Sequence, residues 1–134
     1  MRELAAVIVG GLVGTGLRLG LDVLVPHDGR EFPVSTFVIN LVGSLVLGFL
    51  VARVWPLAPA WLRVGLGTGL IGSFTTFSAL ILSTLGLAHN GEVVLGAVYL
   101  VVSLFGGFGA ALLGLRLGGD ARRGHVTEID EVAE

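Results

Sequence analysis

The sequence predicts an all-α membrane protein with four transmembrane helices, the third of them broken near its middle. The 134 residues are 54% hydrophobic and only 13% charged, against about 25% charged residues in soluble domains. Four apolar stretches each reach the roughly 20 residues that span a bilayer, and only short turns separate them. These stretches are Leu4–Val25, Pro33–Val54, Trp61–Leu87 and Val93–Leu117. A run of hydroxyl residues interrupts the third of them.

The first stretch is too long for an ordinary signal peptide and does not end in a small-residue cleavage site. Its glycines, Gly10 with Gly14 and Gly16 with Gly20, recur four apart and would allow close helix packing. Arg18 is the one basic residue deep within a span, where a cation needs a partner or water. Asp22, one turn later, is a possible partner. A structural ion pair and an electropositive funnel for anions both remain open.

The second stretch carries Thr36, Asn40 and Ser44 at positions i, i+4 and i+8, so they lie along one helix face. None is charged, and each can donate a hydrogen bond. Such a stripe could replace the water around a small ion without a fixed charge that traps it. For Asn40 taken alone, a structural hydrogen bond between helices is an equally good interpretation.

The third stretch contains the run Gly72–Ser78, in which four hydroxyl residues follow one glycine. Non-helical backbone survives at membrane depth only where protein or a polar cavity covers it. The run therefore predicts a broken helix beside an ion or substrate path. The alternative is a continuous helix whose Ser and Thr side chains bond back to the preceding turn. On the fourth stretch Tyr99 and Ser103 are again four apart, with Gly107 next in the row.

The charges predict the orientation. All eight basic residues are arginines, and six fall on the side shared by the two termini: Arg2, Arg53, Arg63, Arg116, Arg122 and Arg123. The positive-inside rule then places both termini in the cytoplasm. Residues 118–134 are expected to form a solvated, flexible cytoplasmic tail. The net charge of −2 indicates no nucleic-acid partner, and the absence of cysteine excludes disulfides and cysteine metal sites.

These motifs resemble the CrcB/Fluc family of fluoride channels over nearly the whole chain. The resemblance rests on the glycine-rich segment ending in Arg18, the T-x-x-x-N-x-x-G-S pattern from Thr36, the G-x-x-T-T-F-S pattern from Gly72 and the polar track of the fourth stretch. It implies a fluoride-selective passive channel that exports cytoplasmic fluoride across the cell membrane. It also implies a dimer of antiparallel subunits.

The resemblance also implies functional residues and a bound ion. A structural sodium ion at the dimer centre would be held by the main-chain carbonyls of Gly72 and Thr75. Arg18 would sit in the vestibule. The residues that the resemblance places along the fluoride pore are Asn40, Phe77, Ser78, Tyr99 and Ser103.

Three positions depart from the family pattern. Ala79 and Leu80 replace a threonine and a second phenylalanine, and Gly107 stands where a third hydroxyl residue is common. A leucine has no polarised ring edge and a glycine no hydroxyl, so one pore wall looks weakened. Together with the arginine bias, this suggests one half of a heterodimer of two different, oppositely oriented proteins. A homodimer remains the alternative.

Other function classes fit less well. A proton-coupled small multidrug exporter would need a carboxylate near the membrane centre, whereas Glu3, Asp22 and Glu92 lie near the ends of spans. A purely structural membrane subunit would not explain the break in the third stretch. An enzyme is least expected, because the sequence contains no nucleophile–base pair, metal cluster or phosphate-binding loop.

Overall fold

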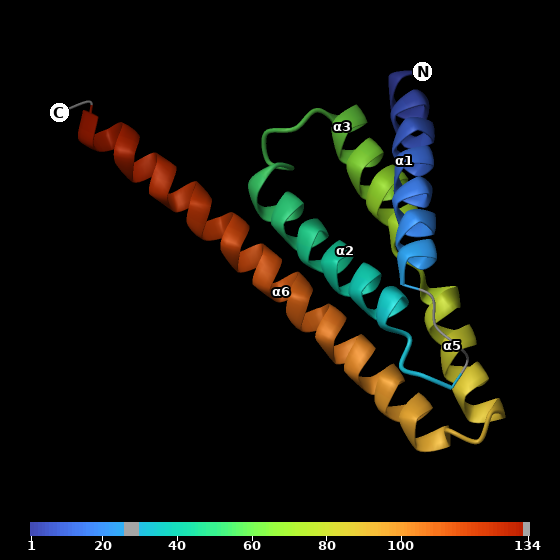
Figure 1. Ribbon diagram of the computed structural model, residues 1–134. Helices are drawn as coiled ribbons and strands as arrows, with labels where there is room; N and C mark the ends of the chain where they lie inside the picture. The colour runs from blue at the N-terminus through green and yellow to red at the C-terminus, as the bar shows by residue number, and fades with distance from the viewer. Residues whose placement is uncertain (26–29, 133–134) are drawn as a thin grey trace.

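The computed structural model describes residues 1–25 and 30–132, with side chains up to Gly119, and is helical along nearly all of them (Figure 1). Within these described residues, four helical segments are long and apolar enough to cross a membrane, which confirms the predicted four-helix fold class. The elements in order are α1 (Arg2–Leu24), α2 (Val34–Arg53), α3 (Ala60–Val64), η1 (Gly65–Ile71), α4 (Gly72–Phe74), α5 (Phe77–His89) and α6 (Val93–Val132). The protein is therefore a multi-pass membrane protein, and α3 to α5 together form its third span.

The last helix is longer than the sequence predicted. The apolar span was expected to end at Leu117, and the candidate membrane span found among the described residues is Val93–Gly119. The helical backbone continues to Val132. The flexibility expected of residues 118–134 stays a prediction, as does their cytoplasmic location. The first turn, residues 26–29, lies outside the described residues.

The helices pack mainly in two pairs, α1 against η1 and α2 against α6. Glycines allow both pairs to approach closely. A Cβ on Gly14 would collide with the carbonyl oxygen of Leu70 in η1, and one on Gly48 would collide with the carbonyl oxygen of Ala111 in α6. Backbone therefore lies directly on backbone, as is common where lipid supplies no hydrophobic drive between helices. We call the α1–η1 and α2–α6 pairings the glycine contacts.

The two glycine pairs predicted on α1 differ in what they touch. Gly10 and Gly14 pack against the backbone of the third span, whereas Gly16 and Gly20 have open space within 4 Å of where a Cβ would be. Only the first pair therefore serves packing inside this chain.

The third span departs from a regular α-helix at two places. Residues Gly65–Ile71 form a π-helix, and such a segment often accompanies a functional site. The chain then leaves the helix at two extended residues, Thr75 (φ −78°, ψ 156°) and Thr76 (φ −149°, ψ 118°), before α5 begins at Phe77. The predicted break is confirmed, and the alternative of a continuous third helix is wrong.

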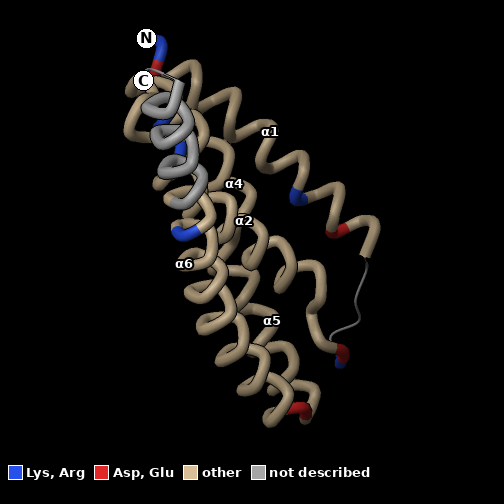
Figure 2. The backbone as a smooth tube through the Cα atoms, turned by 90° about the vertical axis from the view of Figure 1, so that its left-hand side faces the viewer, with Lys and Arg blue, Asp and Glu red and all other residues tan. Residues whose placement is uncertain are grey.

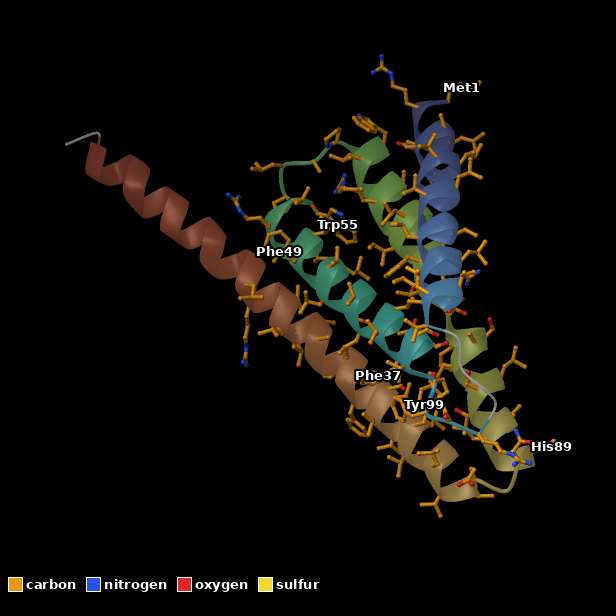
Figure 3. The ribbon with its side chains drawn as sticks, viewed as in Figure 1. Met1, Phe37, Phe49, Trp55, His89 and Tyr99 are labelled. Carbon is orange, nitrogen blue, oxygen red and sulfur yellow. The ribbon has the colours of Figure 1, made fainter. Side chains whose placement is uncertain are left out.

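The side chains face mostly outward, as expected of a protein surrounded by lipid. A small core joins α5 to α6 around Leu80, Leu87 and Tyr99, and Figure 3 shows Phe37 and Tyr99 close together, far from Met1. Charged residues lie mainly near the ends of the tube in Figure 2, with a few part-way along α1 and α6. The polar side chains that come together around the break are uncharged.

Candidate functional site

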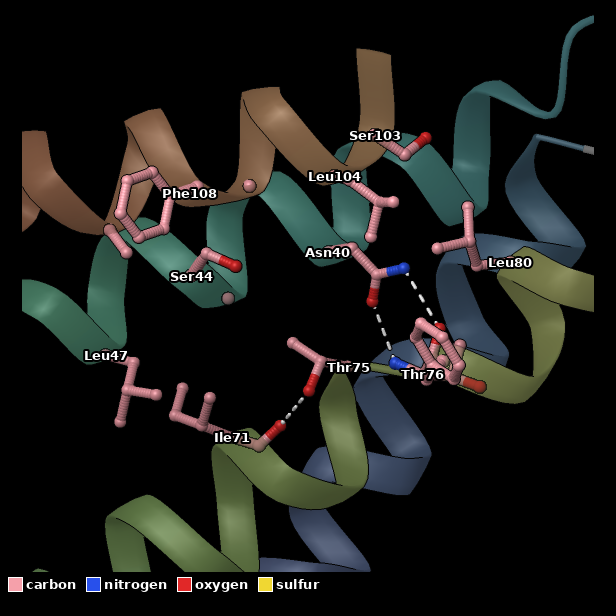
Figure 4. A pocket seen from close by; sticks show the side chains of 14 residues that line it. Asn40, Ser44, Leu47, Ile71, Thr75, Thr76, Leu80, Ser103, Leu104 and Phe108 are labelled. Carbon is pink, nitrogen blue, oxygen red and sulfur yellow. Dashed lines mark hydrogen bonds between the residues drawn. The ribbon is translucent and has the colours of Figure 1, made fainter. Parts of the chain in front are cut away.

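A groove of about 450 Å³ lies where the break faces α2 and α6 (Figure 4). Apolar side chains such as Leu47, Leu80, Leu104 and Phe108 form much of its wall. Among the described residues that line it, none is ionisable. Its polar side chains are those of Asn40, Ser44, Thr75, Thr76 and Ser103. The groove thus offers a small polar species hydrogen bonds without a fixed charge.

Asn40 is tied to the break by two hydrogen bonds. Its Nδ2 donates to the carbonyl oxygen of Thr76 at 3.0 Å, and the backbone N–H of Thr76 donates to Asn40 Oδ1 at 2.8 Å. The amide thereby replaces two helical partners of Thr76: an acceptor for its N–H and a donor for its carbonyl oxygen. Because an amide nitrogen carries two N–H groups, one donor is left over. The structural interpretation of Asn40 is therefore correct, and it leaves a donor for an ion.

The break also changes the partners of two carbonyl groups. In a regular helix the N–H of Thr76 would donate to Gly72 and the N–H of Ala79 to Thr75. Here the first donates to Asn40 Oδ1, and the second to Thr76 Oγ1 at 3.1 Å. The Gly72 and Thr75 carbonyls have both lost their usual helical donors. Carbonyls in this state are suited to a hard cation, which prefers oxygen ligands.

The side chain of Thr75 serves the local structure. Its Oγ1 donates to the carbonyl oxygen of Ile71 at 2.9 Å, as does its backbone N–H. Its Cγ2 occupies the space in which a Cβ on Gly43 would lie. Gly43 on α2 therefore allows the break to lie directly on the second helix, which is what brings Asn40 within reach of Thr76.

The predicted residues of α6 occupy different surroundings. Ser103 lines the groove, whereas Tyr99, one turn earlier, is completely buried and does not line it. The Tyr99 ring meets Phe32 edge-on, with centroids 5.2 Å apart. The buried hydroxyls of Tyr99 and Ser103 make no hydrogen bond with the described residues, although the two lie close to one another.

The residues after the break are also divided between groove and surface. Phe77 lines the groove but is 68% exposed, so no described part of the chain covers its outer face. Ser78 is exposed and its hydroxyl lies 3.2 Å from that of Thr76. Of the three departures, Leu80 and Gly107 line the groove, and Ala79 does not. Leu80 is at the same time part of the core.

Arg18 lies on α1 and does not line the groove. Its side chain is half-buried, and in the described part of the chain no ion pair joins it to Asp22, which is exposed. The structure therefore gives no support to the Arg18–Asp22 pair. The expected vestibule role of Arg18 stays a prediction.

Sequence reasoning left two polar residues of the groove, Thr76 and Ser44, out of the candidate site. Thr76 is the backbone partner of Asn40 and the N-cap of α5, a role that a hydroxyl residue followed by an apolar helix could have indicated. Ser44 belongs to the predicted polar stripe of α2 and lines the groove. The spacing alone had already placed it on the face of Asn40.

Comparisons with known proteins add an independent finding. The family model described as "CrcB-like protein, Camphor Resistance (CrcB)" matches residues 5–115. A "Fluoride-specific ion channel FluC 2" from Halalkalibacterium halodurans is 39% identical over 118 residues, covering 87% of this chain and 86% of the relative. A "Fluoride-specific ion channel FluC" from Pseudomonas putida is 41% identical over 117 residues, 85% of this chain and 94% of the relative. A "Fluoride-specific ion channel FluC 1" from Bacillus cereus is 36% identical over 138 residues, covering 98% and 100%.

Proposed function

Because the chain belongs to the CrcB-like family, an ion channel family and not an enzyme family, we propose that it is a passive, fluoride-selective channel that exports cytoplasmic fluoride. The observation that carries the proposal is the groove at the break, whose polar lining consists of uncharged hydrogen-bond donors. The names of the relatives supply the identity of the ion.

The groove has the physical properties that a small anion requires. The first N–H groups of a helix carry a partial positive charge, and α5 begins at the break. The remaining N–H of Asn40 supplies a further donor. Fluoride can exchange water for these groups and still leave, since no fixed positive charge lines the groove to hold it.

The conducting unit in this proposal is a dimer of oppositely oriented subunits in the cell membrane. The exposed face of Phe77 supports it, because the groove lacks a wall on that side within one chain. Phe105 and Phe108 on α6 are likewise 74% and 67% exposed. A second subunit would enclose the groove and bring the electropositive edge of the Phe77 ring to the ion. Both termini of this chain would lie in the cytoplasm.

A structural sodium ion at the dimer centre is part of the proposal. The Gly72 and Thr75 carbonyls would hold it, and the diversion of their helical donors to Asn40 and Thr76 supports this. Such an ion supplies positive charge that offsets the facing carbonyl dipoles. The chain's own contribution is to direct the usual helical donors of the two carbonyls elsewhere.

The proposal also concerns the identity of the partner: the second subunit is a different protein, so that the dimer is a heterodimer. Leu80 and Gly107 both line the groove, and neither offers a polar group there. A paralogous subunit with the opposite arginine bias would supply the second orientation. Relatives named FluC 1 and FluC 2 occur, which fits the existence of paired genes. Co-expression with a neighbouring paralogue, followed by co-purification, would test this against a homodimer.

Fluoride efflux from liposomes tests the proposed function directly. The purified protein, alone or with its paralogue, should release fluoride without an energy source and retain chloride. Assembled dimers that pass no fluoride, or that pass chloride equally, would contradict the channel. A flux that requires a proton gradient would favour the exporter, although the carboxylates considered for it, Glu3, Asp22 and Glu92, are all exposed.

A further inference from the structure

The hydroxyl group of Ser44 differs from the other hydroxyls that line the groove, since those of Thr75 and Thr76 are hydrogen-bonded and that of Ser103 is buried. Thr75 and Thr84 each donate to the carbonyl oxygen four residues earlier, both at 2.9 Å, which is the common arrangement for a hydroxyl within a membrane helix. Ser44 makes no such bond, nor any other hydrogen bond within the described residues. It lines the groove, and Figure 4 shows its oxygen pointing into the space between α2 and the neighbouring helices.

The wall opposite Ser44 is open because of a glycine. A Cβ placed on Gly107 would lie 3.6 Å from Ser44 Oγ, so any larger side chain there would stand in front of the hydroxyl. The neighbouring wall residues, Leu104 and Phe108, are apolar and offer it no hydrogen bond. The hydroxyl therefore faces an unobstructed part of the groove with its donor unused.

Ser44 also lies in register with Asn40. Residues four apart on a helix are neighbours on the same face, so the two side chains line the groove one turn apart along α2. An ion that leaves the amide of Asn40 on the side away from the break would meet Ser44 next. An unused donor at this point would lower the cost of stripping water from an anion.

On the basis of the proposed function, we propose that Ser44 is an ion-contacting residue, whose hydroxyl donates a hydrogen bond to fluoride in the groove. Gly107 acts with it by keeping the space before the hydroxyl open. Ser44 and Gly107 together give the groove a polar contact on its α2 side, at a level where α6 offers none.

Fluoride efflux from liposomes, measured for four assembled proteins, tests this. Ser44→Ala should lower the flux about tenfold, because a hydrogen bond to a charged group is among the stronger ones. Adding Gly107→Ser to Ser44→Ala should restore most of the flux, since its hydroxyl would start from a Cβ only 3.6 Å from the vacated oxygen. Adding Gly107→Ala instead should restore nothing, because it fills the same space without a donor.

A second pair of variants tests the hydroxyl without leaving a cavity at residue 44. Ser44→Thr and Ser44→Val have nearly the same shape and differ by the hydroxyl, so the threonine variant should conduct at least several-fold better. Equal flux in these two, flux of Ser44→Ala equal to the parent, or equal rescue by Gly107→Ala and Gly107→Ser would each overturn the role of Ser44. An assembled parent without fluoride flux would instead overturn the proposed function itself.

Discussion

The glycine contacts and the helix break hold neighbouring helices together by different means. At the glycine contacts, backbone lies on backbone: Gly14 meets the carbonyl of Leu70, and Gly48 meets that of Ala111. At the break, side chains replace the backbone, with Asn40 and the Thr76 hydroxyl taking over hydrogen bonds that a helix would make. The first arrangement fixes where the helices lie, and the second leaves polar groups free at mid-membrane.

This difference indicates which substitutions should affect ion passage and which should affect stability. A substitution in a glycine contact should disturb folding, because the added side chain would force two packed backbones apart. A substitution at the break should disturb ion passage more than folding, because the side chains there complete a site. The four predictions that follow use this difference, beginning with the largest expected effect.

Asn40→Asp should abolish fluoride flux, with a loss of about 100-fold or more. The aspartate can still accept from the N–H of Thr76, but it loses the bond to the Thr76 carbonyl and the donor left for the ion. A carboxylate in the groove would also repel an anion. Liposome efflux from assembled protein is the measurement. A variant that conducts like the parent would mean that Asn40 serves packing alone.

Removal of sodium should silence flux or weaken the dimer, and Gly72→Val should do the same. Facing carbonyl dipoles would lack their counter-charge without the cation, and a β-branched residue at Gly72 would restrict the backbone of the turn before the break. Thr75→Ser is the matched control, because it keeps both the carbonyl and the hydroxyl that bonds Ile71.

The measurement is flux and dimer stability in sodium against a bulky organic cation. Full activity without sodium, together with a functional Gly72→Val, would show that the two carbonyls bind no cation.

Gly14→Ala should lower the stability of the folded chain by roughly 1–3 kcal/mol, the usual cost of forcing extra atoms into a packed contact. Its added methyl would collide with the carbonyl of Leu70. Gly16→Ala on the same helix is the control, since it meets open space. Thermal unfolding in detergent compares the two. Equal losses of stability in the two variants would mean that the close contact of Gly14 with Leu70 does not matter.

Thr76→Ala should have the smallest effect, a loss of about 1 kcal/mol, typical of a removed N-cap. The N–H of Ala79 would lose the Thr76 hydroxyl as its acceptor. Thr76→Ser retains that acceptor and should match the parent in unfolding experiments. If Thr76→Ala also lowers the effect of sodium on dimer stability, the freed N–H has returned to the Thr75 carbonyl and competes with the cation.

The sequence alone determined the four spans, the position of the break and the polar face of α2. Hydropathy and helical spacing are local properties, so they do not depend on how the helices are arranged. The run Gly72–Ser78 predicted the break because glycine and hydroxyl residues weaken a helix locally. It did not predict the π-helix before it, whose seven residues pack against α1.

Only the tertiary structure decided what each polar group does. Spacing placed Tyr99 and Ser103 on one track, yet the packing of Phe32 buries the first in the core while the second lines the groove. Spacing also placed Asn40 and Ser44 on one face, yet only Asn40 meets the break, because Gly43 admits Thr75 beside it. These outcomes depend on the rotation and depth of one helix against another. Those quantities are set by contacts between residues far apart in the chain, which no local pattern contains.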